Sequence, residues 1–476
     1  MLEGLEGKEV FLSECLEQKD FRLEADFWIQ RNHAETKTIK GSEIIDFVQY
    51  GTSKELIEEQ EGYPILRLNE FNSRFIDVPK KYCKLISQDD FEALKLRKND
   101  VLICRTNGNP NLVGKCALVA EDVEYAYASY LFKIRPQNEL INSATLVAFL
   151  SCKYGRKEID KYSMTSNQTN FSPAKFREIE VPLFSSQTNH EIEQLYYSAF
   201  NKLKHSEKIY RQAEELLLEA IGLKDFKPSE KGTNIKSFKE SFLATGRLDA
   251  EYYLPKYEDI IDVVKKFRNG FANFDLFIDS YSTGYPYKSE TYINENGIPL
   301  VRINNLTKEG LNLSNAVHIP KEDLNLSKKD IAQENDILIS MSGTIGLSCV
   351  VRENSNIVVN QRIMKTTSKN YNPHVLSMLL NSIIGKYQLE RIGTGGVQTN
   401  ISSNDIKNII IPVIDNPIQQ QIAALIEESF YLRGESEKLL SEAKEMVEGE
   451  IEGGGIKRRK ILCPTIPSFI TAVASA

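Results

Sequence analysis

The chain has 476 residues, of which 41% are hydrophobic and 26% charged, and its formal net charge is −7. These values are ordinary for a globular protein of two or three domains, and they exclude wholesale disorder and a fibre. The negative net charge also argues against a protein that binds nucleic acid through its charge alone. Such a protein gains much of its affinity from Lys and Arg side chains that neutralise phosphates.

Several kinds of segment and site are missing from the sequence. No apolar run approaches the roughly 18–20 residues of a membrane span, and the first ten residues lack the basic-then-apolar order of a secretory signal. The 7 cysteines never form a Cys-x-x-Cys pair, and the 5 histidines show no ligand spacing. We therefore expect a cytoplasmic protein with reduced thiols, no membrane contact and no metal site.

Residues 1–186 are predicted to form a mixed α/β domain. Strand-like runs such as Ile65–Leu68 and Val101–Cys104 alternate with Gly, Pro and Asn, and a helical stretch follows at Leu146–Lys153. Between strands, Gly108–Lys115 resembles a phosphate-binding loop. However, its glycines are six apart instead of five, and Cys116 stands where Ser or Thr would hold Mg²⁺. We interpret it as a turn.

Residues 187–224 are predicted to form one long helix. One row of positions steps alternately by four and three residues over about four heptads: Ile192, Tyr196, Ala199, Leu203, Ser206, Tyr210, Ala213, Leu217 and Ala220. This spacing is typical of a helix that packs lengthwise against a partner. The predicted seam residues are Ile192, Leu195, Ala199, Leu203, Ser206, Ala213 and Leu217.

Residues 225–413 repeat the first domain, with a helical stretch at Val375–Ile383. Five short segments recur in the same order: Arg22–Trp28 as Arg247–Tyr253, Gly62–Asn69 as Gly297–Asn304, Asn99–Ile103 as Asn335–Ile339, Gln168–Ser172 as Gln398–Ser402 and Val181–Pro182 as Ile411–Pro412. The offset drifts between 225 and 236 at first and is a constant 230 from Gln168 onward. Five ordered matches predict an internal duplication, with small insertions in loops.

Residues 414–452 are predicted to form a second long helix, before a flexible tail at 453–476. Its seam residues are Ile422, Leu425, Ser429, Leu432, Ser436, Leu439 and Ala443. Both helices carry one column of small residues, so we expect them to pair with each other in antiparallel orientation. The pair would form a rod of roughly 50 Å between two domains that are related by a pseudo-twofold axis.

In the tail, the basic run Lys457–Lys460 either contacts nucleic acid or is simply solvated.

Catalytic motifs are absent from both halves. We find no Asn-Pro-Pro-Tyr or Asp-Pro-Pro-Tyr run of an amino methyltransferase and no glycine fingerprint for a cofactor at a strand–helix turn. No Ser/His/Asp or Cys/His set recurs in the two halves. We therefore expect a non-catalytic protein that holds no cofactor of its own.

The repeated loops carry the side chains that read DNA bases: Arg for guanine, and Asn or Gln for adenine. Two domains on a rigid spacer also suit duplex DNA, whose helical turn is roughly 34–36 Å. The candidate contacts are Arg67, Asn69, Arg105, Asn107, Asn167, Gln168 and Asn170 in the first repeat, and Arg302, Asn304, Gln398 and Asn400 in the second. The structural alternative is that Asn69 and Asn304 cap turns and that the Gln-Thr-Asn triplets open a helix.

From about residue 20 to 452, the order of these motifs resembles the specificity subunit of type I restriction–modification systems. The motifs run from strand–Arg-x-Asn through Asn-Asp-x-Leu-Ile and Gln-Thr-Asn-x-Ser to a hydrophobic-Pro strand and a heptad helix. The most similar segments are Gly395–Ser402, Asn408–Pro412 and Gln419–Ile422. The first copy departs from them, with Asn167 in place of the hydrophobic Val397 and His190 in place of Gln420.

This resemblance implies two target-recognition domains in a mixed α/β fold, each reading one half of a bipartite double-stranded DNA site, with the helices fixing the gap. It also implies partners: two methyltransferase subunits and, in restricting complexes, translocase–nuclease subunits. Adenine methylation would use S-adenosylmethionine held by a partner, and ATP and Mg²⁺ are likewise expected in partners only. No base contact transfers residue by residue.

Three other interpretations stay open on the sequence. The chain could be the specificity chain of a type II system with a fused methyltransferase–nuclease partner, which the co-purifying partner would reveal. It could be a nuclease, although no carboxylate–Lys cluster repeats, and a metal-dependent cleavage assay would decide. It could be a coiled-coil scaffold that never touches DNA, and weak salt dependence of any DNA affinity would favour that.

Overall fold

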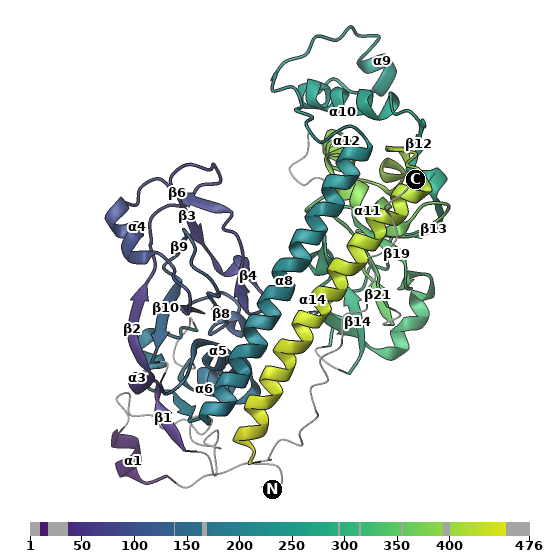
Figure 1. Ribbon diagram of the computed structural model, residues 1–476. Helices are drawn as coiled ribbons and strands as arrows, with labels where there is room; N and C mark the ends of the chain where they lie inside the picture. Colours follow the sequence, from purple (N-terminus) through teal and green to yellow (C-terminus); the bar gives the residue numbers. More distant parts are fainter. Residues whose placement is uncertain are drawn as a thin grey trace, which may run out of the picture. The chain divides into compact units, whose positions relative to one another are not determined.

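A computed structural model describes residues 10–17, 37–137, 139–163, 169–293, 296–313, 316–353, 356–393 and 400–453 (Figure 1). The chain divides into two compact units, Met1–Leu203 with Gly434–Ala476 and Lys204–Arg433. Each unit contains one repeat and half of each long helix, α8 (Ser186–Ala220) and α14 (Asn416–Ile451). A helix that is continuous in sequence is thus shared between two units, which sequence periodicity alone does not show.

The first unit is built around a six-stranded sheet with both parallel and antiparallel pairs. Its strands are β1 (Thr38–Lys40), β2 (Ile45–Tyr50), β3 (Tyr63–Leu66), β4 (Phe71–Asn72), β5 (Phe75–Ile76), β6 (Lys81–Cys83), β7 (Val101–Cys104), β8 (Cys116–Leu118), β9 (Ala126–Tyr127), β10 (Leu131–Pro136) and β11 (Glu180–Pro182). Its helices, besides α8 and α14, are α1 (Leu12–Glu17), α3 (Gly41–Ile44), η1 (Leu68–Glu70), α4 (Gln88–Leu94), η2 (Pro110–Leu112), α5 (Ser143–Ser151), α6 (Lys153–Ser163) and α7 (Pro173–Phe176). The strand orders are β2-β10-β7-β8-β5-β4, β6-β3-β9 and β1-β11.

The second unit repeats this plan. Its strands are β12 (Phe271–Asn273), β13 (Ile278–Ser282), β14 (Ile298–Val301), β15 (Leu306–Thr307), β16 (Gly310–Leu311), β17 (Val317–Ile319), β18 (Ile331–Ala332), β19 (Asp336–Ser340), β20 (Ser348–Val350), β21 (Ile357–Val359), β22 (Ile363–Ser368) and β23 (Ile410–Pro412). Its other helices are α9 (Phe242–Thr245), η3 (Ala250–Tyr253), α10 (Pro255–Lys265), η4 (Phe274–Phe277), η5 (Ser289–Thr291), η6 (Ile303–Asn305), η7 (Lys321–Leu326), η8 (Lys328–Asp330), α11 (Pro373–Asn381), α12 (Ile383–Gly393) and α13 (Ser403–Asn408). The strand orders are β13-β22-β19-β20, β17-β14-β21-β18, β12-β23 and β15-β16.

Matching strands of the two units pair with matching neighbours. β7 lies between β10 and β8, and β19 lies between β22 and β20. β3 pairs in parallel with β9, and β14 pairs in parallel with β21. The mixed α/β fold and the duplication are therefore confirmed.

The repeated Asn-Asp step is a turn that leads into the central strand. Asn99 and Asn335 adopt left-handed backbone, with φ of 72° and 68°, which Asn tolerates better than most residues. The following Asp100 is fully buried. It accepts hydrogen bonds from the backbone N–H of Arg97 at 2.9 Å and from Arg135 Nη2 at 2.6 Å. Buried carboxylates need such partners, so this repeat serves the fold and not the binding surface.

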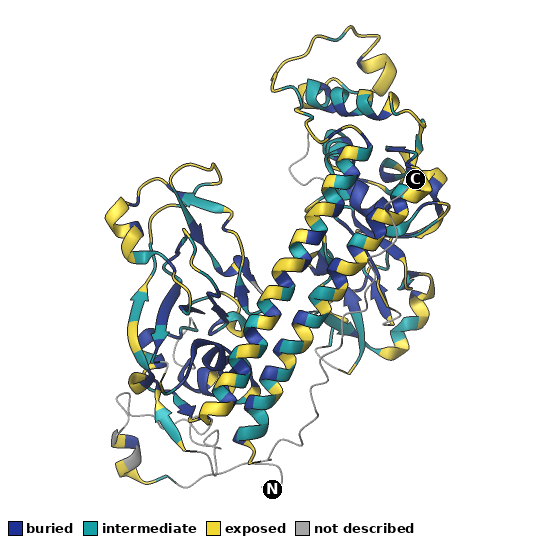
Figure 2. Cartoon of the chain, viewed as in Figure 1, coloured by how far each residue is buried: buried dark blue, intermediate teal, exposed yellow. Residues whose placement is uncertain are grey.

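The two long helices pair antiparallel through their small residues. In the first unit, Ser436 Oγ donates to the Ala199 carbonyl at 2.8 Å. In the second unit, Ser429 Oγ donates to the Ser206 carbonyl at 2.8 Å. The partner number falls in α14 as it rises in α8, which confirms the antiparallel arrangement. Figure 2 shows the buried stripe that runs along each helix.

The remaining predicted seam residues are also buried or half-buried. The small residues Ala213 and Ala443 and the large residues Ile192, Leu203, Leu217 and Ile422 are buried, and Leu195, Leu425, Leu432 and Leu439 are half-buried. Every predicted seam residue therefore has reduced exposure, as expected for close helix packing. None of the described helices has the length and apolar character needed to span a membrane.

Candidate nucleic-acid interface

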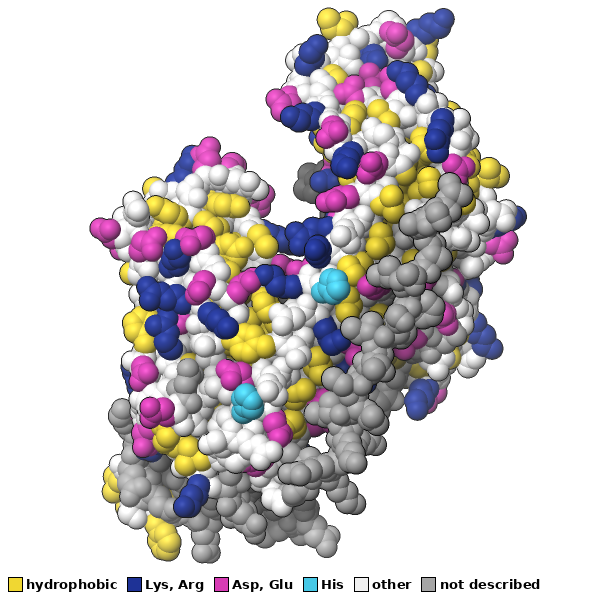
Figure 3. Space-filling model, in the orientation of Figure 1, with side chains coloured by type: hydrophobic (Ala, Val, Ile, Leu, Met, Phe, Trp, Pro, Cys, Tyr) yellow, Lys and Arg dark blue, Asp and Glu magenta, His cyan; other side chains and the backbone are white. Residues whose placement is uncertain are grey.

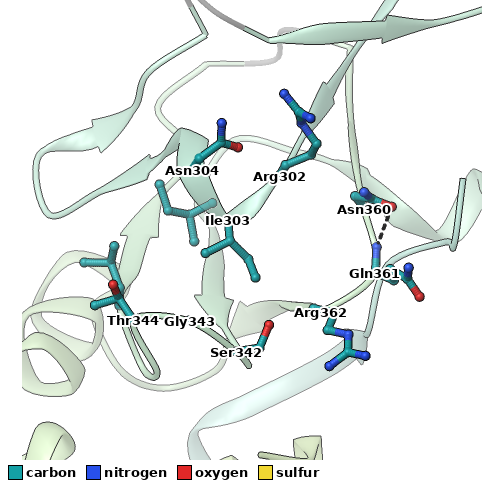
Figure 4. Close-up of a pocket in the computed structure, with 11 residues that line it drawn as sticks. Arg302, Ile303, Asn304, Ser342, Gly343, Thr344, Asn360, Gln361 and Arg362 are labelled. Atoms are coloured by element: carbon teal, nitrogen blue, oxygen red, sulfur yellow. Dashed lines mark hydrogen bonds between the residues drawn. The ribbon is translucent and has the colours of Figure 1, made fainter. Parts of the chain in front are cut away.

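A hollow of about 630 Å³, lined by both apolar and polar side chains, lies at one end of the strands in the second unit. Its lining comes from three places: the chain after β14, the β19–β20 loop and the turn before β22 (Figure 4). The lining residues are Arg302, Ile303, Asn304, Leu306, Ser342, Gly343, Thr344, Leu347, Asn360, Gln361 and Arg362. This lining includes two arginines and three amide side chains and no carboxylate, so its net character is basic and rich in hydrogen-bonding groups.

Arg302 stands at the end of β14, where the chain turns into η6. Its backbone N–H donates to Asn305 Oδ1 at 2.9 Å, and its guanidinium carbon lies 5.9 Å from the centre of the Tyr292 ring. No carboxylate among the described residues pairs with it, and its buried Nε has no hydrogen-bond partner there. The positive charge of Arg302 is therefore available to a ligand.

Asn400 is brought to the same hollow from a distant part of the chain. It forms an isolated antiparallel bridge with Ser342, and its Oδ1 accepts a hydrogen bond from Arg362 Nη1 at 2.5 Å. Asn304, which lines the hollow, is exposed. Three predicted residues of the second repeat, Arg302, Asn304 and Asn400, thus gather around one site.

Arg67 is the first-repeat counterpart of Arg302, but its charge is offset. Buried Glu70 stands where the second repeat has Asn305, and it accepts from the Arg67 backbone N–H at 2.7 Å and from Arg67 Nη2 at 2.9 Å. The hydrogen bond to Glu70 raises the pKa of Arg67. Arg67 is therefore held as half of an ion pair, whereas Asn69 beside it is exposed.

Arg105 and Asn170 lie together in the first repeat. The Arg105 carbonyl accepts the Phe171 N–H at 2.8 Å, and Asn170 bridges Thr106. The Arg105 guanidinium carbon is 5.2 Å from the centre of the Tyr50 ring. The buried Arg105 Nε and Asn170 Oδ1 have no hydrogen-bond partner among the described residues.

The structural alternatives for the amide residues have mixed outcomes. Asn107 Oδ1 accepts the Asn109 N–H at 2.8 Å, so Asn107 stabilises its own loop. Asn69 and Asn304 do not cap their turns, because Glu70 and Asn305 do so. The serine two residues after Asn170, Ser172, caps the short helix α7, and the serine two residues after Asn400, Ser402, caps α13. Asn167, Gln168 and Gln398 lie outside the described residues, as does the basic run Lys457–Lys460.

Sequence reasoning missed Asn360, Gln361 and Arg362. They form a polar triplet between the buried strand β21 and the buried start of β22, which is a turn signal that the sequence does contain. The triplet was missed because its first-repeat counterpart, Ala128-Ser129-Tyr130, has different side chains, so no repeat marked it. Burial of the Tyr130 side chain raises its pKa to about 12, and it carries no charge at neutral pH.

The glycine-rich stretch Gly108–Lys115 lies in the connection between β7 and β8. Gly114 has φ of 77° and packs against Ile159, and burial lowers the pKa of Lys115. The stretch is a turn between strands. Among the described residues, no group of three His, Cys, Asp or Glu side chains is placed to hold a metal ion.

Acidic and basic side chains are mixed over the face of the molecule drawn in Figure 3. With a net charge of −7, charge alone supplies little attraction to phosphates. Contact with a polyanion would therefore be local, at sites such as the hollow around Arg302 and Arg362.

A model of the type I restriction modification DNA specificity domain matches residues 35–214 and 274–441, one match in each repeat. The EcoKI type I restriction enzyme specificity subunit of Escherichia coli (strain K12) is 21% identical over 399 residues, covering 80% of this chain and 78% of that protein. The StySPI specificity subunit of Salmonella potsdam is 27% identical over 147 residues, or 29% of this chain and 30% of that one.

The solved structures that this chain matches include the type I restriction–modification S subunit from M. genitalium. It is 12% identical, covers 89% of this chain and 96% of its own, and has a TM-score of 0.38. The HsdS subunit from Thermoanaerobacter tengcongensis is 13% identical, with 88% and 97% covered and a TM-score of 0.29.

Proposed function

The chain belongs to the family of type I restriction modification DNA specificity domains, and from that premise we propose that each of its repeats reads one half of a bipartite DNA site. It is a non-catalytic specificity subunit whose role is to recognise DNA sequence. The nuclease and scaffold interpretations are not favoured, because both repeats match the specificity family.

The observation that supports this proposal is the hollow in the second unit. It presents Arg302, Arg362 and the amides of Asn304, Asn360 and Gln361 without an acidic residue among its lining. Arginine and amide side chains are those that form paired hydrogen bonds with base edges in the major groove. The first repeat offers Arg105, Asn69 and Asn170 in the corresponding loops.

We further propose that the chain acts in the cytoplasm with two methyltransferase subunits and, for cleavage, with restriction–translocase subunits. The partners would hold S-adenosylmethionine, ATP and Mg²⁺, and methylation would fall on adenine. The net charge of −7 supports dependence on partners, since a partner would supply part of the phosphate contact.

The test is to co-express the chain with the methyltransferase encoded beside it and to sequence the methylated sites of host DNA. We expect a bipartite adenine-methylated motif. Exchange of residues 20–185 should change one half of the motif, and exchange of residues 245–410 should change the other half.

A complex that forms but methylates no defined motif would overturn the proposal. A single partner that carries both the methyltransferase and the nuclease would assign the chain to a type II system and would leave the reading of DNA intact.

A further inference from the structure

Arg362 has an unusual backbone conformation for an arginine. Its φ is 73°, in the left-handed region. The other described non-glycine residues with positive φ all have short polar side chains: Ser73, Asn99, Asn296, Asn335, Asn356 and Asn370. In this region the Cβ atom of an L-residue crowds the backbone and costs free energy. Arginine lacks the short polar side chain that offsets this cost in asparagine by bonding locally, so the conformation of Arg362 requires an explanation.

The fold itself does not require this conformation. Arg362 stands three residues after the parallel pair Val301 and Val359, and Tyr130 stands three residues after the matching pair Leu66 and Tyr127. The Arg362 carbonyl accepts the Met341 N–H at 2.8 Å, and the Tyr130 carbonyl accepts the Arg105 N–H at the same distance. Tyr130 makes this bond without a positive φ. The same strand connection is thus available to an unstrained backbone.

The strained backbone places the guanidinium beside the hollow. Figure 4 shows Asn360 and Gln361 between Arg302 and Arg362 around the rim, with the two guanidinium groups extending in different directions. Arg362 is exposed, and its Nη1 donates to Asn400 Oδ1. Because an arginine has five N–H donors in a planar fork, a bond to Asn400 leaves an edge free for a ligand while it fixes the plane of the fork.

We propose that Arg362 selects a guanine in the half-site read by the second repeat, and that Asn400 is a positioning residue that orients its guanidinium. The ligand is the major-groove edge of guanine, whose N7 and O6 accept two parallel N–H bonds from an arginine fork. This assignment rests on the proposed reading of DNA by the second repeat. In the first repeat Tyr130 replaces Arg362, so the two half-sites are read by different chemistry.

Arg362→Gly tests the assignment in the full chain co-expressed with its methyltransferase. Glycine adopts positive φ freely, so we expect no loss of thermal stability. The preference for guanine at one position of the second half-site should fall by about 10- to 100-fold, the usual discrimination of a paired arginine–guanine contact. Competition binding with duplexes that differ at each position measures this ratio.

Asn370→Gly is the matched control. Asn370 also has positive φ, 55°, and is exposed, and it does not line the hollow. We expect the same stability as for Arg362→Gly and unchanged base preference. Arg362→Lys keeps the charge without the fork, and it should retain affinity for DNA while losing the guanine preference. Asn400→Ala should weaken the preference less than Arg362→Gly does.

The possible outcomes separate the two proposals. If the wild-type complex selects a bipartite site and Arg362→Gly selects the same bases with unchanged ratios, the assignment of Arg362 is wrong and the proposed function stands. If Arg362→Gly lowers the affinity equally for all sequences, Arg362 is a phosphate contact and the assignment is wrong. The assignment is also wrong if Arg362→Gly removes the preference for a base other than guanine. If the wild-type complex selects no site, the proposed function fails and this assignment fails with it.

Discussion

At the scale of single residues, one substitution between the repeats changes the state of an otherwise equivalent arginine. Glu70 in the first repeat and Asn305 in the second both accept the backbone N–H three residues earlier. Only the glutamate also neutralises the guanidinium, at 2.9 Å. The same backbone turn therefore yields an ion pair in one repeat and an available cation in the other.

Arg67→Ala and Arg302→Ala should consequently differ in stability. Loss of Arg67 leaves the buried Glu70 carboxylate without its charged partner and should cost about 1–3 kcal/mol of unfolding free energy. Loss of Arg302 breaks no such pair and should stay within about 0.5 kcal/mol, while DNA affinity falls. Denaturant unfolding of both variants, together with DNA titration, measures the two effects. Equal destabilisation by the two substitutions would contradict this account.

At the scale of elements, the close approach of α8 and α14 depends on small residues that also use their hydroxyl groups. Ser206 and Ser429 are buried, with their Oγ atoms 3.1 Å apart. A serine hydroxyl in a helix pair can bond a backbone carbonyl, as Ser429 and Ser436 both do. Small size allows the approach, and the hydroxyl bonds favour one register of the antiparallel pair.

Ser206→Leu should therefore destabilise the helix pair. A larger side chain at a fully packed position costs about 1–3 kcal/mol, and the chain should melt at a lower temperature. Lys208→Leu, at an exposed position of the same helix, is the control and should have little effect. Circular dichroism during heating measures both variants, and similar melting of Ser206→Leu and the wild type would show that the helices do not pack closely at this residue.

At the scale of the whole molecule, the chain is acidic although its role is to recognise DNA. Its net charge is −7, and acidic and basic side chains are mixed on the face drawn in Figure 3. Recognition by base edges fixes sequence, whereas phosphate contacts supply most of the salt-dependent affinity.

The isolated chain should accordingly bind DNA weakly, with a shallow dependence of log K on log salt. Addition of the methyltransferase should increase both the affinity and the slope, because each neutralised phosphate contributes about 0.9 to the slope on duplex DNA. Fluorescence anisotropy over a range of salt concentrations measures both. An isolated chain with the slope of the complex would mean that it carries the phosphate contacts itself.

Local patterns predicted much of this architecture. The duplication, the two long helices and the antiparallel pairing follow from repeated segments and from heptad spacing, both of which are properties of the order of residues along the chain. Val101–Cys104 is a strand with the predicted bounds, whereas the predicted strand at Ile65–Leu68 ends at Leu66 because η1 begins at Leu68. Arg302, Asn304 and Asn400 were candidates because their segments recur.

The sequence by itself therefore determined the repeat, the helix pair and a set of candidate side chains, because each depends on spacing along the chain. Only the tertiary structure decided which candidate side chains are available to bind DNA. Folding places Asn400 beside Arg362, 38 positions away, neutralises Arg67 with Glu70, and gives Arg362 its positive φ. These features depend on contacts between distant segments and on backbone conformation, which composition and periodicity do not specify.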